Sequence, residues 1–229
     1  RFKIIMKTAL VFGSSGLIGG HVLQKLIHNN NYHKIKVFVR SDPKIDDPKL
    51  EIIRTDFDNL KKYKEHIKGD DCFFCIGTTK QNTPNKDEYR RIEYSIPVET
   101  AEIAKLNSIN SFIYVSSGFA DPESSGAYLK NKGEVEEELK KLNFSKLVIM
   151  RPAFLMGKRR EKRKWEKIGM FFFKILSPLF FGSLKKMKPI HSEIVAKVMI
   201  RVANENLGKT IFESNEIAEL NLDQAQPNN

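Results

Sequence analysis

Residues 8–19 read TALVFGSSGLIG, and this stretch decides the fold of the 229-residue chain. Residues 8–12 are apolar and β-prone, which predicts a buried strand, and the pattern after the glycines predicts a helix over residues 21–28. Gly13 allows a tight turn, Gly16 lets a ligand approach the backbone, and Gly19 lets the helix pack on the strand. The helix N-terminus would face a phosphate. An ordinary glycine turn is the alternative, but the position between a strand and a helix favours a dinucleotide site.

The same alternation of strand and helix continues along the chain. Further strands are predicted over residues 35–39, 51–55, 71–76, 112–116 and 146–150, with helices over 98–106 and 128–142. Strands separated by helical patterns indicate βαβ units, and strands without clean alternation suit a sheet covered on both faces. We therefore expect an α/β fold with a doubly wound parallel sheet, Rossmann-like, as a single domain over residues 1–229.

Beyond Pro152 the pattern changes. Residues 192–202 form an amphipathic pattern, for which Ser192 is the expected N-cap, and the chain from Asn221 is polar and expected to fray. Residues 153–190 are expected to form a small C-terminal cap segment on the substrate side of the domain.

Composition narrows the class of protein. With 41% hydrophobic and 29% charged residues, the chain is expected to be globular rather than disordered. Its two cysteines cannot form a disulfide framework, so a reducing compartment is expected, and we predict a cytoplasmic protein. We expect no secretory signal and no membrane span, since a span needs about 20 apolar residues. Met6 is the expected natural start, with Arg1–Ile5 as an extension.

The end of the second strand bears on the choice of dinucleotide. At this point an acidic residue holds the ribose 2′-hydroxyl of NAD, whereas an arginine accommodates the 2′-phosphate of NADP. Here the strand ends in Val39-Arg40-Ser41, and a guanidinium beside a hydroxyl suits a phosphate. NADP(H) is therefore favoured over NAD(H). Two alternatives stay open: Asp42 would oppose the phosphate if it pointed inward, and Arg40 would otherwise be a solvated surface charge.

Several segments in a fixed order carry a resemblance to a known family. Tyr128 and Lys132 form a Tyr-x-x-x-Lys pattern, and a pair of serines, Ser116 and Ser117, precedes it. Together with the glycine motif, this resembles the short-chain dehydrogenase/reductase superfamily in its extended and atypical branches. Further segments resemble the atypical subgroup that includes the Tat-interacting protein oxidoreductase: residues 75–79 (CIGTT), 128–136 (YLKNKGEVE), 151–152 (RP) and 189–196 (PIHSEIVA). The likeness extends from about residue 7 to residue 204.

The Tyr-x-x-x-Lys pattern has a physical basis of its own. Residues four apart lie on one face of a helix, so Tyr128 and Lys132 can point into one cleft, where an ammonium favours the phenolate. The resemblance implies Tyr128 as general acid or base, Lys132 as a ribose ligand that tunes Tyr128, and Ser117 as the hydrogen-bond donor to the substrate oxygen. Ser116 replaces Ser117 if the register is off by one. Alternatively, Tyr128 packs the helix on the sheet and Lys132 is solvated.

The resemblance also implies a set of cofactor contacts. Asp56 would lie near the adenine, residues 77–79 along the cofactor, and Pro152 with Ala153 near the nicotinamide. Glu93 departs from the asparagine frequent at its position in extended members, and no role is assigned to it. The full expected cofactor-binding set is Gly13, Ser14, Ser15, Gly16, Leu17, Ile18, Gly19, Arg40, Ser41, Asp56, Phe57, Gly77, Thr78, Thr79, Lys132, Pro152 and Ala153.

No metal is expected. Cys72 and Cys75 form a Cys-x-x-Cys within an apolar strand, where a spacing of three puts them on opposite faces. Buried thiols are therefore expected rather than a redox or zinc pair. The five histidines have no metal-ligand spacing.

One basic segment remains outside this scheme. Residues 158–188 carry +9 of the net charge of +11 and include five phenylalanines. A substrate-side cap is favoured, peripheral contact with an anionic membrane is the alternative, and no nucleic acid is expected. The sequence thus predicts an NADP(H)-dependent oxidoreductase acting on the carbonyl or alcohol group of an apolar small molecule. The alternative is an NADP(H)-binding regulatory or interaction protein with little turnover, in contact with a membrane or not.

Overall fold

A seven-stranded parallel sheet forms the centre of the computed structural model, which describes residues 6–156 and 189–223. The strand order is β3-β2-β1-β4-β5-β6-β9, so the direction of strand addition reverses between β1 and β4. Ligands of open α/β sheets bind outside the carboxyl ends of the strands at such a reversal. The strands are β1 (Lys7–Phe12), β2 (Tyr32–Val39), β3 (Leu50–Arg54), β4 (Asp71–Phe74), β5 (Ser111–Val115), β6 (Lys146–Arg151) and β9 (Ile211–Glu213).

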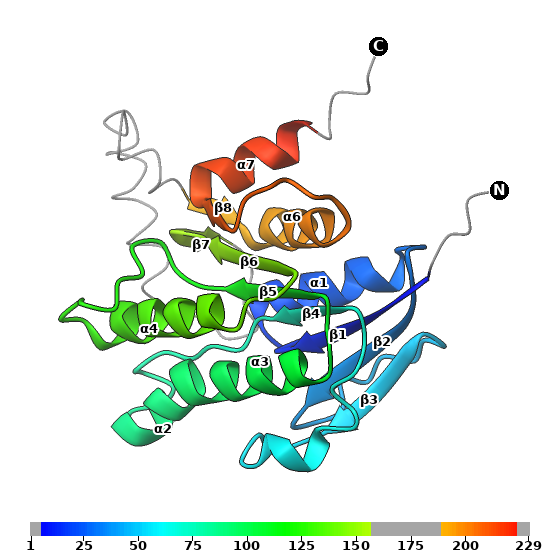
Figure 1. Cartoon of the computed structure of the whole chain (residues 1–229), viewed down its shortest axis with the longest axis horizontal. Coiled ribbons are helices and arrows are strands. Elements are labelled where there is room, and N and C mark those ends of the chain that lie inside the picture. Colours follow the sequence, from blue (N-terminus) through cyan, green and yellow to red (C-terminus); the bar gives the residue numbers. More distant parts are fainter. Residues whose placement is uncertain (1–5, 157–188, 224–229) are drawn as a thin grey trace.

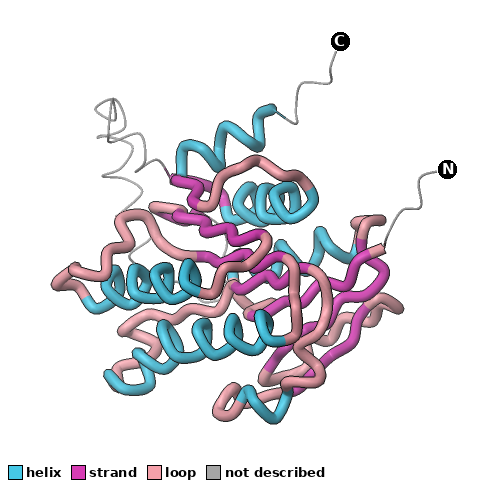
Figure 2. Tube along the Cα trace, in the orientation of Figure 1, coloured by secondary structure: helices cyan, strands magenta, loops and turns pink. Residues whose placement is uncertain are grey.

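Helices cover both faces of the sheet (Figure 1, Figure 2). One face packs against α1 (Leu17–Ile27), α6 (Ser192–Asn204) and α7 (Ser214–Asp223). The opposite face packs against α3 (Ile96–Leu106) and α4 (Ala127–Lys141). A short helix α2 (Lys86–Arg90) leads through a π-helical turn η2 (Arg91–Ser95) into α3, and a 3-10 turn η1 (Leu60–Tyr63) follows β3. The prediction of a doubly wound Rossmann-like α/β fold is confirmed.

Alternating side chains of the strands build the two halves of the core. In β1, Ala9 and Val11 face the α1/α6 side, while Leu10 and Phe12 face the α3/α4 side. On the second side Phe12 stacks on Phe38 with ring centroids 4.3 Å apart and on Phe74 at 5.7 Å. Burial of both faces explains why the strands are apolar at nearly every position.

Several element boundaries differ from the sequence predictions. Helix α1 begins at Leu17 rather than residue 21, and β4 ends at Phe74 rather than residue 76. The predicted N-cap Ser192 is wrong: His191 occupies the N-cap, and Ser192 is the buried first residue of α6. The fraying predicted from residue 221 is also wrong as far as Asp223, because α7 continues to that residue.

The expected cap segment is anchored by a small second sheet. Strand β7 (Phe154–Met156) pairs in parallel with β8 (Pro189–His191), so the two ends of residues 153–190 lie side by side. The basic and Phe-rich residues 157–188, to which the cap and membrane predictions refer, lie outside the described residues, as do residues 1–5. No helix in residues 6–156 and 189–223 is long and apolar enough to cross a membrane.

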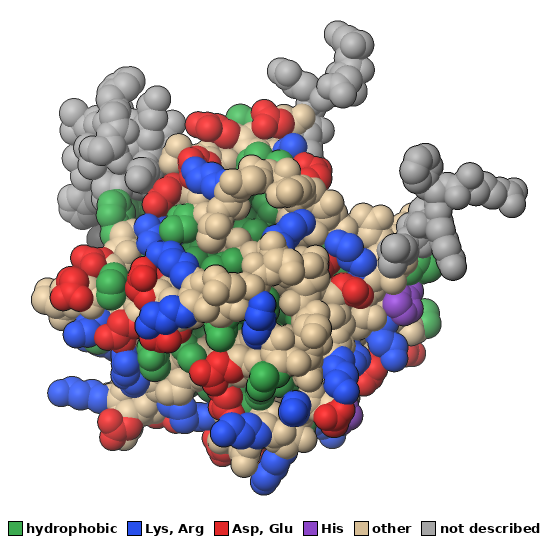
Figure 3. All heavy atoms as spheres, viewed as in Figure 1, with side chains coloured by type: hydrophobic (Ala, Val, Ile, Leu, Met, Phe, Trp, Pro, Cys, Tyr) green, Lys and Arg blue, Asp and Glu red, His purple; other side chains and the backbone are tan. Residues whose placement is uncertain are grey.

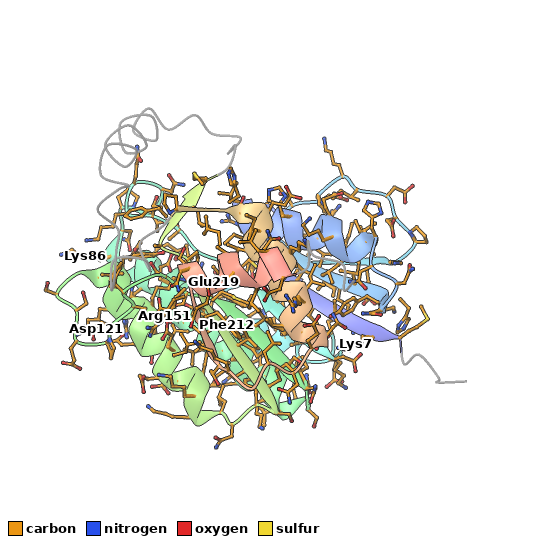
Figure 4. All side chains as sticks on the ribbon, turned by 90° about the horizontal axis from the view of Figure 1, so that it is seen from above. Lys7, Lys86, Asp121, Arg151, Phe212 and Glu219 are labelled. Carbon is orange, nitrogen blue, oxygen red and sulfur yellow. The ribbon has the colours of Figure 1, made fainter. Side chains whose placement is uncertain are left out.

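The two ends of the strands have different surroundings. Lys86 and Asp121, from segments that follow strand ends, lie at one end of the molecule, and Lys7 at the start of β1 lies at the other (Figure 4). Over the face seen in Figure 3, basic and acidic side chains are interspersed. Because ligands of such sheets bind outside the carboxyl ends of the strands, we expect the candidate site residues at the carboxyl ends of β1, β2, β4, β5 and β6.

Candidate nucleotide and catalytic site

The glycine loop holds α1 against the sheet at the point where the strand order reverses. Gly13 has φ +86°, and a Cβ there would lie 2.7 Å from the backbone carbon of Cys75 after β4. A Cβ at Gly19 would lie 2.1 Å from the Gly13 carbonyl oxygen, so the helix approaches the loop as closely as backbone atoms allow. The tight turn and the close helix packing expected for Gly13 and Gly19 are both present.

The loop fits the phosphates of a dinucleotide. Helix α1 begins directly after Gly16, and its first turn carries no acidic residue that would repel an anion. Ser15 and Gly16 are exposed, and the buried Ser14 hydroxyl has no hydrogen-bond partner among the residues of the structure. Ile18 packs into the core, so only its backbone can face a ligand. The residues here therefore fit NAD(P)(H), with helix N–H groups and one free hydroxyl as donors.

The ends of β2 and β3 each carry an arginine. Arg40 follows β2, is exposed and acts on the Glu88 carboxylate of α2, whereas Arg54 ends β3 opposite Val39. Asp42 is engaged: it accepts the Lys44 N–H at 2.8 Å and forms an ion pair with Arg54 at 3.1 Å. These contacts, the Lys44 hydrogen bond foremost, hold the pKa of Asp42 below its ordinary value. Arg54 was not anticipated from the sequence, since nothing in its local pattern distinguishes it from a surface charge.

The two cofactor contacts expected after β3, Asp56 and Phe57, differ in what they expose: the Phe57 side chain is buried and the Asp56 side chain is not. Phe57 has φ +65°, and its buried ring packs near Phe12. Its N–H donates to the Thr55 hydroxyl at 3.0 Å, and its carbonyl accepts Arg91 Nη1 at 3.0 Å. Asp56 is exposed, and its carboxylate accepts the Asp58 N–H. Of the two expected contacts, only Asp56 has a side chain accessible to a nucleotide.

Lys132 is the buried centre of the candidate catalytic site. Its side chain is 5% exposed, and Nζ lies 3.1 Å from Glu93 Oε2, 3.1 Å from the Tyr114 hydroxyl and 3.3 Å from the Val115 carbonyl oxygen. Burial acts to lower the pKa of Lys132, but the Glu93 carboxylate and the neighbouring tyrosines hold it well above its usual range. The alternative of a solvated Lys132 is therefore wrong.

Tyr128 lies one helical turn before Lys132 and close to the solvent. Both residues belong to α4, and Tyr128 is 39% exposed. The Tyr128 phenol is near enough to raise the pKa of Lys132, whereas the buried Tyr89 and Tyr114 have their own pKa values raised to about 12 by burial. The exposure of Tyr128 does not support the alternative in which it packs α4 on the sheet.

Glu93 is a site residue that the sequence interpretation missed. It is 1% exposed, and its Oε1 accepts the backbone N–H of Thr78 at 2.5 Å. A Cβ at Gly77 would lie 3.4 Å from the same carboxylate oxygen. The loop of residues 77–79 therefore lies directly against the Lys132–Glu93 pair. The available signal was the spacing Tyr89, Glu93, Ile96, which puts an acid on the apolar stripe of a helix.

The serine pair divides into one engaged and one available hydroxyl. Ser116 donates to Glu136 Oε1 at 2.5 Å, and Arg151 binds the same carboxylate through Nε at 2.9 Å. The Ser117 hydroxyl has only a 3.3 Å contact with the carbonyl oxygen of Gly118. Ser117 therefore remains the candidate donor to a substrate oxygen.

The ends of β5 and β6 lie against each other beside Ser117. The Gly118 N–H donates to the Pro152 carbonyl at 3.0 Å, and a Cβ at Gly118 would lie 3.1 Å from the Cα of Ala153. Pro152 and Ala153 thus lie next to the serine pair, and the nicotinamide contact that the resemblance implies for them stays a prediction.

The two cysteines are separated by the sheet. Cys72 packs in the α3/α4 half of the core, and Cys75 packs against the α1/α6 half, as their spacing predicted. Burial raises the pKa of Cys75 to about 12 and that of Cys72 well above its usual value. Within the part of the chain that the structure describes, no group of three His, Cys, Asp or Glu side chains could hold a metal ion.

Comparison with known proteins agrees with this geometry. The model of the NAD(P)H-binding family matches residues 13–206. The chain belongs to the NAD(P)H-binding family. Within this family it is an atypical short-chain dehydrogenase/reductase related to the Tat-interacting protein subgroup. It is 31% identical over 204 residues to protein FMP52, mitochondrial, of Debaryomyces hansenii, covering 87% of this chain and 89% of the relative. It is also 31% identical to protein HTATIP2 of Rattus norvegicus over 176 residues, covering 75% of this chain and 72% of the relative.

Several solved structures share the fold. Bordetella bronchiseptica WbmH in complex with NAD+ superposes with a TM-score of 0.69 at 16% identity, covering 98% of this chain and 83% of WbmH. The UDP-N-acetylglucosamine 4-epimerase of Methanobrevibacter ruminantium has a TM-score of 0.67 at 20% identity, covering 90% and 75%. At these identities the likeness is one of fold alone.

The names of the relatives correct one prediction. The FMP52 relatives of Debaryomyces hansenii, Scheffersomyces stipitis and other fungi are named mitochondrial. The expectation of a cytoplasmic protein is therefore wrong. It rested on the two free cysteines, and unpaired cysteines report a reducing environment without distinguishing among the compartments that provide one.

Proposed function

We propose that the protein is an NADP(H)-dependent oxidoreductase that reduces the carbonyl, or oxidises the alcohol, of an apolar small molecule. The observation that carries the proposal is a buried Lys132 that lies beside the 77–79 loop, one helical turn from an exposed Tyr128. A bound NADP(H) would supply or accept the hydride. The protein would supply the proton, the binding surface and the charge around the reacting oxygen.

Each group has a part that follows from its surroundings. Tyr128 is exposed at the start of α4, so it can donate a proton to a substrate oxygen or accept one from it. The Ser117 hydroxyl would orient that oxygen, since Ser116 is committed to Glu136. Lys132 is fixed and charged next to the phenol, and a nearby cation favours the phenolate that Tyr128 forms on proton donation.

The preference for NADP(H) is supported by the ends of β2 and β3. Arg40 is exposed at the end of β2, and the Asp42 carboxylate, which would repel a 2′-phosphate, is already paired with Arg54 of β3. A phosphate held by guanidinium groups gains charge-assisted hydrogen bonds that a ribose hydroxyl does not offer.

An apolar substrate is supported by the aromatic surroundings of Ser117. Phe119 is 51% exposed with φ +64°, a conformation that costs a non-glycine residue about 1–3 kcal/mol. Phe154 is equally exposed, and the backbones before both rings meet at Gly118 and Ala153. Two exposed rings in the segments next to Ser117 favour a substrate with an apolar body. The names of the FMP52 relatives support a mitochondrial location.

The test combines nucleotide binding with turnover of a carbonyl panel. Purified protein is titrated with NADPH and with NADH by nicotinamide fluorescence, and NADPH oxidation is then followed with apolar ketones, aldehydes and quinones. Tyr128→Phe should lower turnover by about 10²- to 10⁴-fold with nucleotide binding retained. Tyr63→Phe, on η1 and outside the described contacts of Lys132, is the matched control and should leave turnover unchanged. Equal turnover by Tyr128→Phe and wild type would refute the catalytic assignment, and binding without turnover would favour a regulatory nucleotide-binding protein.

A further inference from the structure

Glu93 is a buried carboxylate that the proposed reaction does not use. It lies in the π-helical turn η2, a distortion that is rare in helices and frequent at functional sites. Its two oxygens face two different donors. Oε1 accepts the Thr78 N–H at 2.5 Å, and Oε2 lies 3.1 Å from Lys132 Nζ. The carboxylate therefore bridges the loop after β4 and the lysine of α4.

The groups around Lys132 leave Glu93 as its counter-charge. The titratable groups that act on Lys132 or are acted on by it come from α2, η2, β5, α4 and the end of β4, and they are Tyr89, Glu93, Tyr114, Tyr128 and Cys75. Burial raises the pKa values of Tyr89, Tyr114 and Cys75 to about 12, so these three are neutral near pH 7. Within this set only Glu93 is a carboxylate, so it is the group that supplies a negative charge to the Lys132 ammonium.

The ammonium of Lys132 donates hydrogen bonds to two neutral acceptors, the Tyr114 hydroxyl and the Val115 carbonyl oxygen, and forms an ion pair with the Glu93 carboxylate. Because both of these acceptors are neutral, removal of the carboxylate would leave a buried cation without compensation, which is strongly unfavourable. Glutamine cannot replace Glu93 here, since its amide oxygen could accept the Thr78 N–H but it carries no charge to compensate the buried ammonium.

We propose that Glu93 is a positioning residue whose carboxylate fixes the Lys132 ammonium and ties it to the Gly77–Thr79 loop. The inference rests on the proposed function, in which Lys132 contacts the cofactor ribose and adjoins Tyr128. Through this bridge, the loop that lines the cofactor and the lysine that adjoins the proton donor are held at one fixed separation.

The test measures the titration of Lys132 directly, without substrate or nucleotide. Protein labelled with ¹³C at the lysine Cε is titrated by NMR, and the Lys132→Met spectrum assigns the Lys132 signal. In wild type, Lys132 should titrate above the exposed lysines, because Glu93 outweighs the desolvation of the ammonium. In Glu93→Gln it should titrate below them, since desolvation is the largest influence on its pKa and the carboxylate that most opposes it is gone. Glu93→Asp, which keeps the charge and both acceptors, should restore the high value.

Glu102→Gln is the matched control. Glu102 is exposed on α3, so the same change of charge there should leave the Lys132 titration as in wild type. Glu93→Gln should also weaken NADPH binding measured by fluorescence, whereas Glu102→Gln should not. A Lys132 signal in Glu93→Gln that titrates with or above the exposed lysines would overturn the proposal.

Two further measurements distinguish failure of the proposed function from failure of the role proposed for Glu93. If wild type binds no nucleotide, the proposed function fails, while the lysine titration still decides the role of Glu93. If Glu93→Gln does not fold, the double variant Glu93→Gln/Lys132→Met removes the uncompensated cation and should recover folding. A double variant as unstable as Glu93→Gln would show that Glu93 does not act through Lys132 and would overturn the proposal.

Discussion

At the scale of single residues, buried charges do the most to fix the carboxyl end of the sheet. Glu136 is 1% exposed and receives the Ser116 hydroxyl and two nitrogens of Arg151, which also contacts Glu213. Two of the segments that carried the family resemblance, residues 128–136 and 151–152, are thus joined in space by one ion pair. Sequence reasoning found both segments but had no means of pairing them, because the contact depends on the packing of α4 against β6.

Removal of Arg151 is expected to destabilise the fold strongly. Arg151→Ala leaves the buried Glu136 carboxylate uncompensated, and breaking a buried pair in this way costs about 3–5 kcal/mol. Lys141→Ala, which removes an exposed ion pair with Glu138 on the same helix α4, should change stability little. Urea unfolding of both variants measures the difference. Equal urea midpoints for the two variants would show that the buried Arg151–Glu136 pair stabilises the fold no more than the exposed Lys141–Glu138 pair does.

Cys75 is expected to make stability fall at alkaline pH. Burial raises its thiol pKa to about 12, whereas the unfolded chain has an ordinary value near 8.5. Above about pH 8.5 the unfolded state loses its thiol proton and the native state keeps it, so the native state loses stability as the pH rises toward about 12. Cys75→Ala removes this contribution and should lose less stability than wild type between about pH 8 and about pH 10, measured by urea unfolding. An identical loss in both proteins would contradict the assignment.

At the scale of elements, the buried strands and the amphipathic helices were predictable, and the elements without a clear apolar pattern were not. Strands β1 to β6 and helices α1, α3, α4 and α6 follow from apolar runs and helical spacing. The three-residue strands β7, β8 and β9, the five-residue α2 and η2, and the mostly polar α7 show no such pattern. Glu93 was missed for the same reason: its role depends on the η2 turn, which brings it against a loop and a helix distant in sequence.

The junction of β1 and α1 gives the element-scale prediction. Gly19→Ala places a Cβ 2.1 Å from the Gly13 carbonyl oxygen, so α1 must move away from the loop. We expect a lower melting temperature and loss of NADPH binding. Gly20→Ala is the matched control on the same helix, since its Cβ meets only the Ser14 carbonyl oxygen at 3.3 Å and alanine favours the helix by about 1 kcal/mol. Retained NADPH binding in Gly19→Ala would contradict the phosphate-binding role of this loop.

At the scale of the whole molecule, the candidate site draws on both halves of the sheet. The glycine loop and the β2 end come from one side of the strand reversal, and β5, α4 and β6 come from the other. The strand order itself was predictable only as far as a parallel, doubly wound sheet. The side-by-side placement of the β2 and β3 ends, which brings Arg54 to Asp42, required the structure.

A ligand that contacts both halves should stabilise the whole fold. NADPH at about 100 times its dissociation constant is expected to raise the free energy of unfolding by about 2.7 kcal/mol, measured by urea unfolding. Arg54→Ala releases Asp42 from its ion pair, so it should weaken NADPH binding by about tenfold, equivalent to about 1.4 kcal/mol, and leave NADH binding unchanged. An equal effect on both nucleotides would show that this corner does not contact the 2′-phosphate.

The pairing of β7 with β8 bears on how such a protein can diversify. Strands β7 and β8 form a sheet of their own, a short parallel ladder of three residue pairs outside the seven-stranded sheet. The register of the seven strands is set by their pairing with one another. Substitutions confined to the β7–β8 ladder during evolution would leave that register untouched. Selection can thus vary this second ladder without altering the sheet that carries the glycine loop.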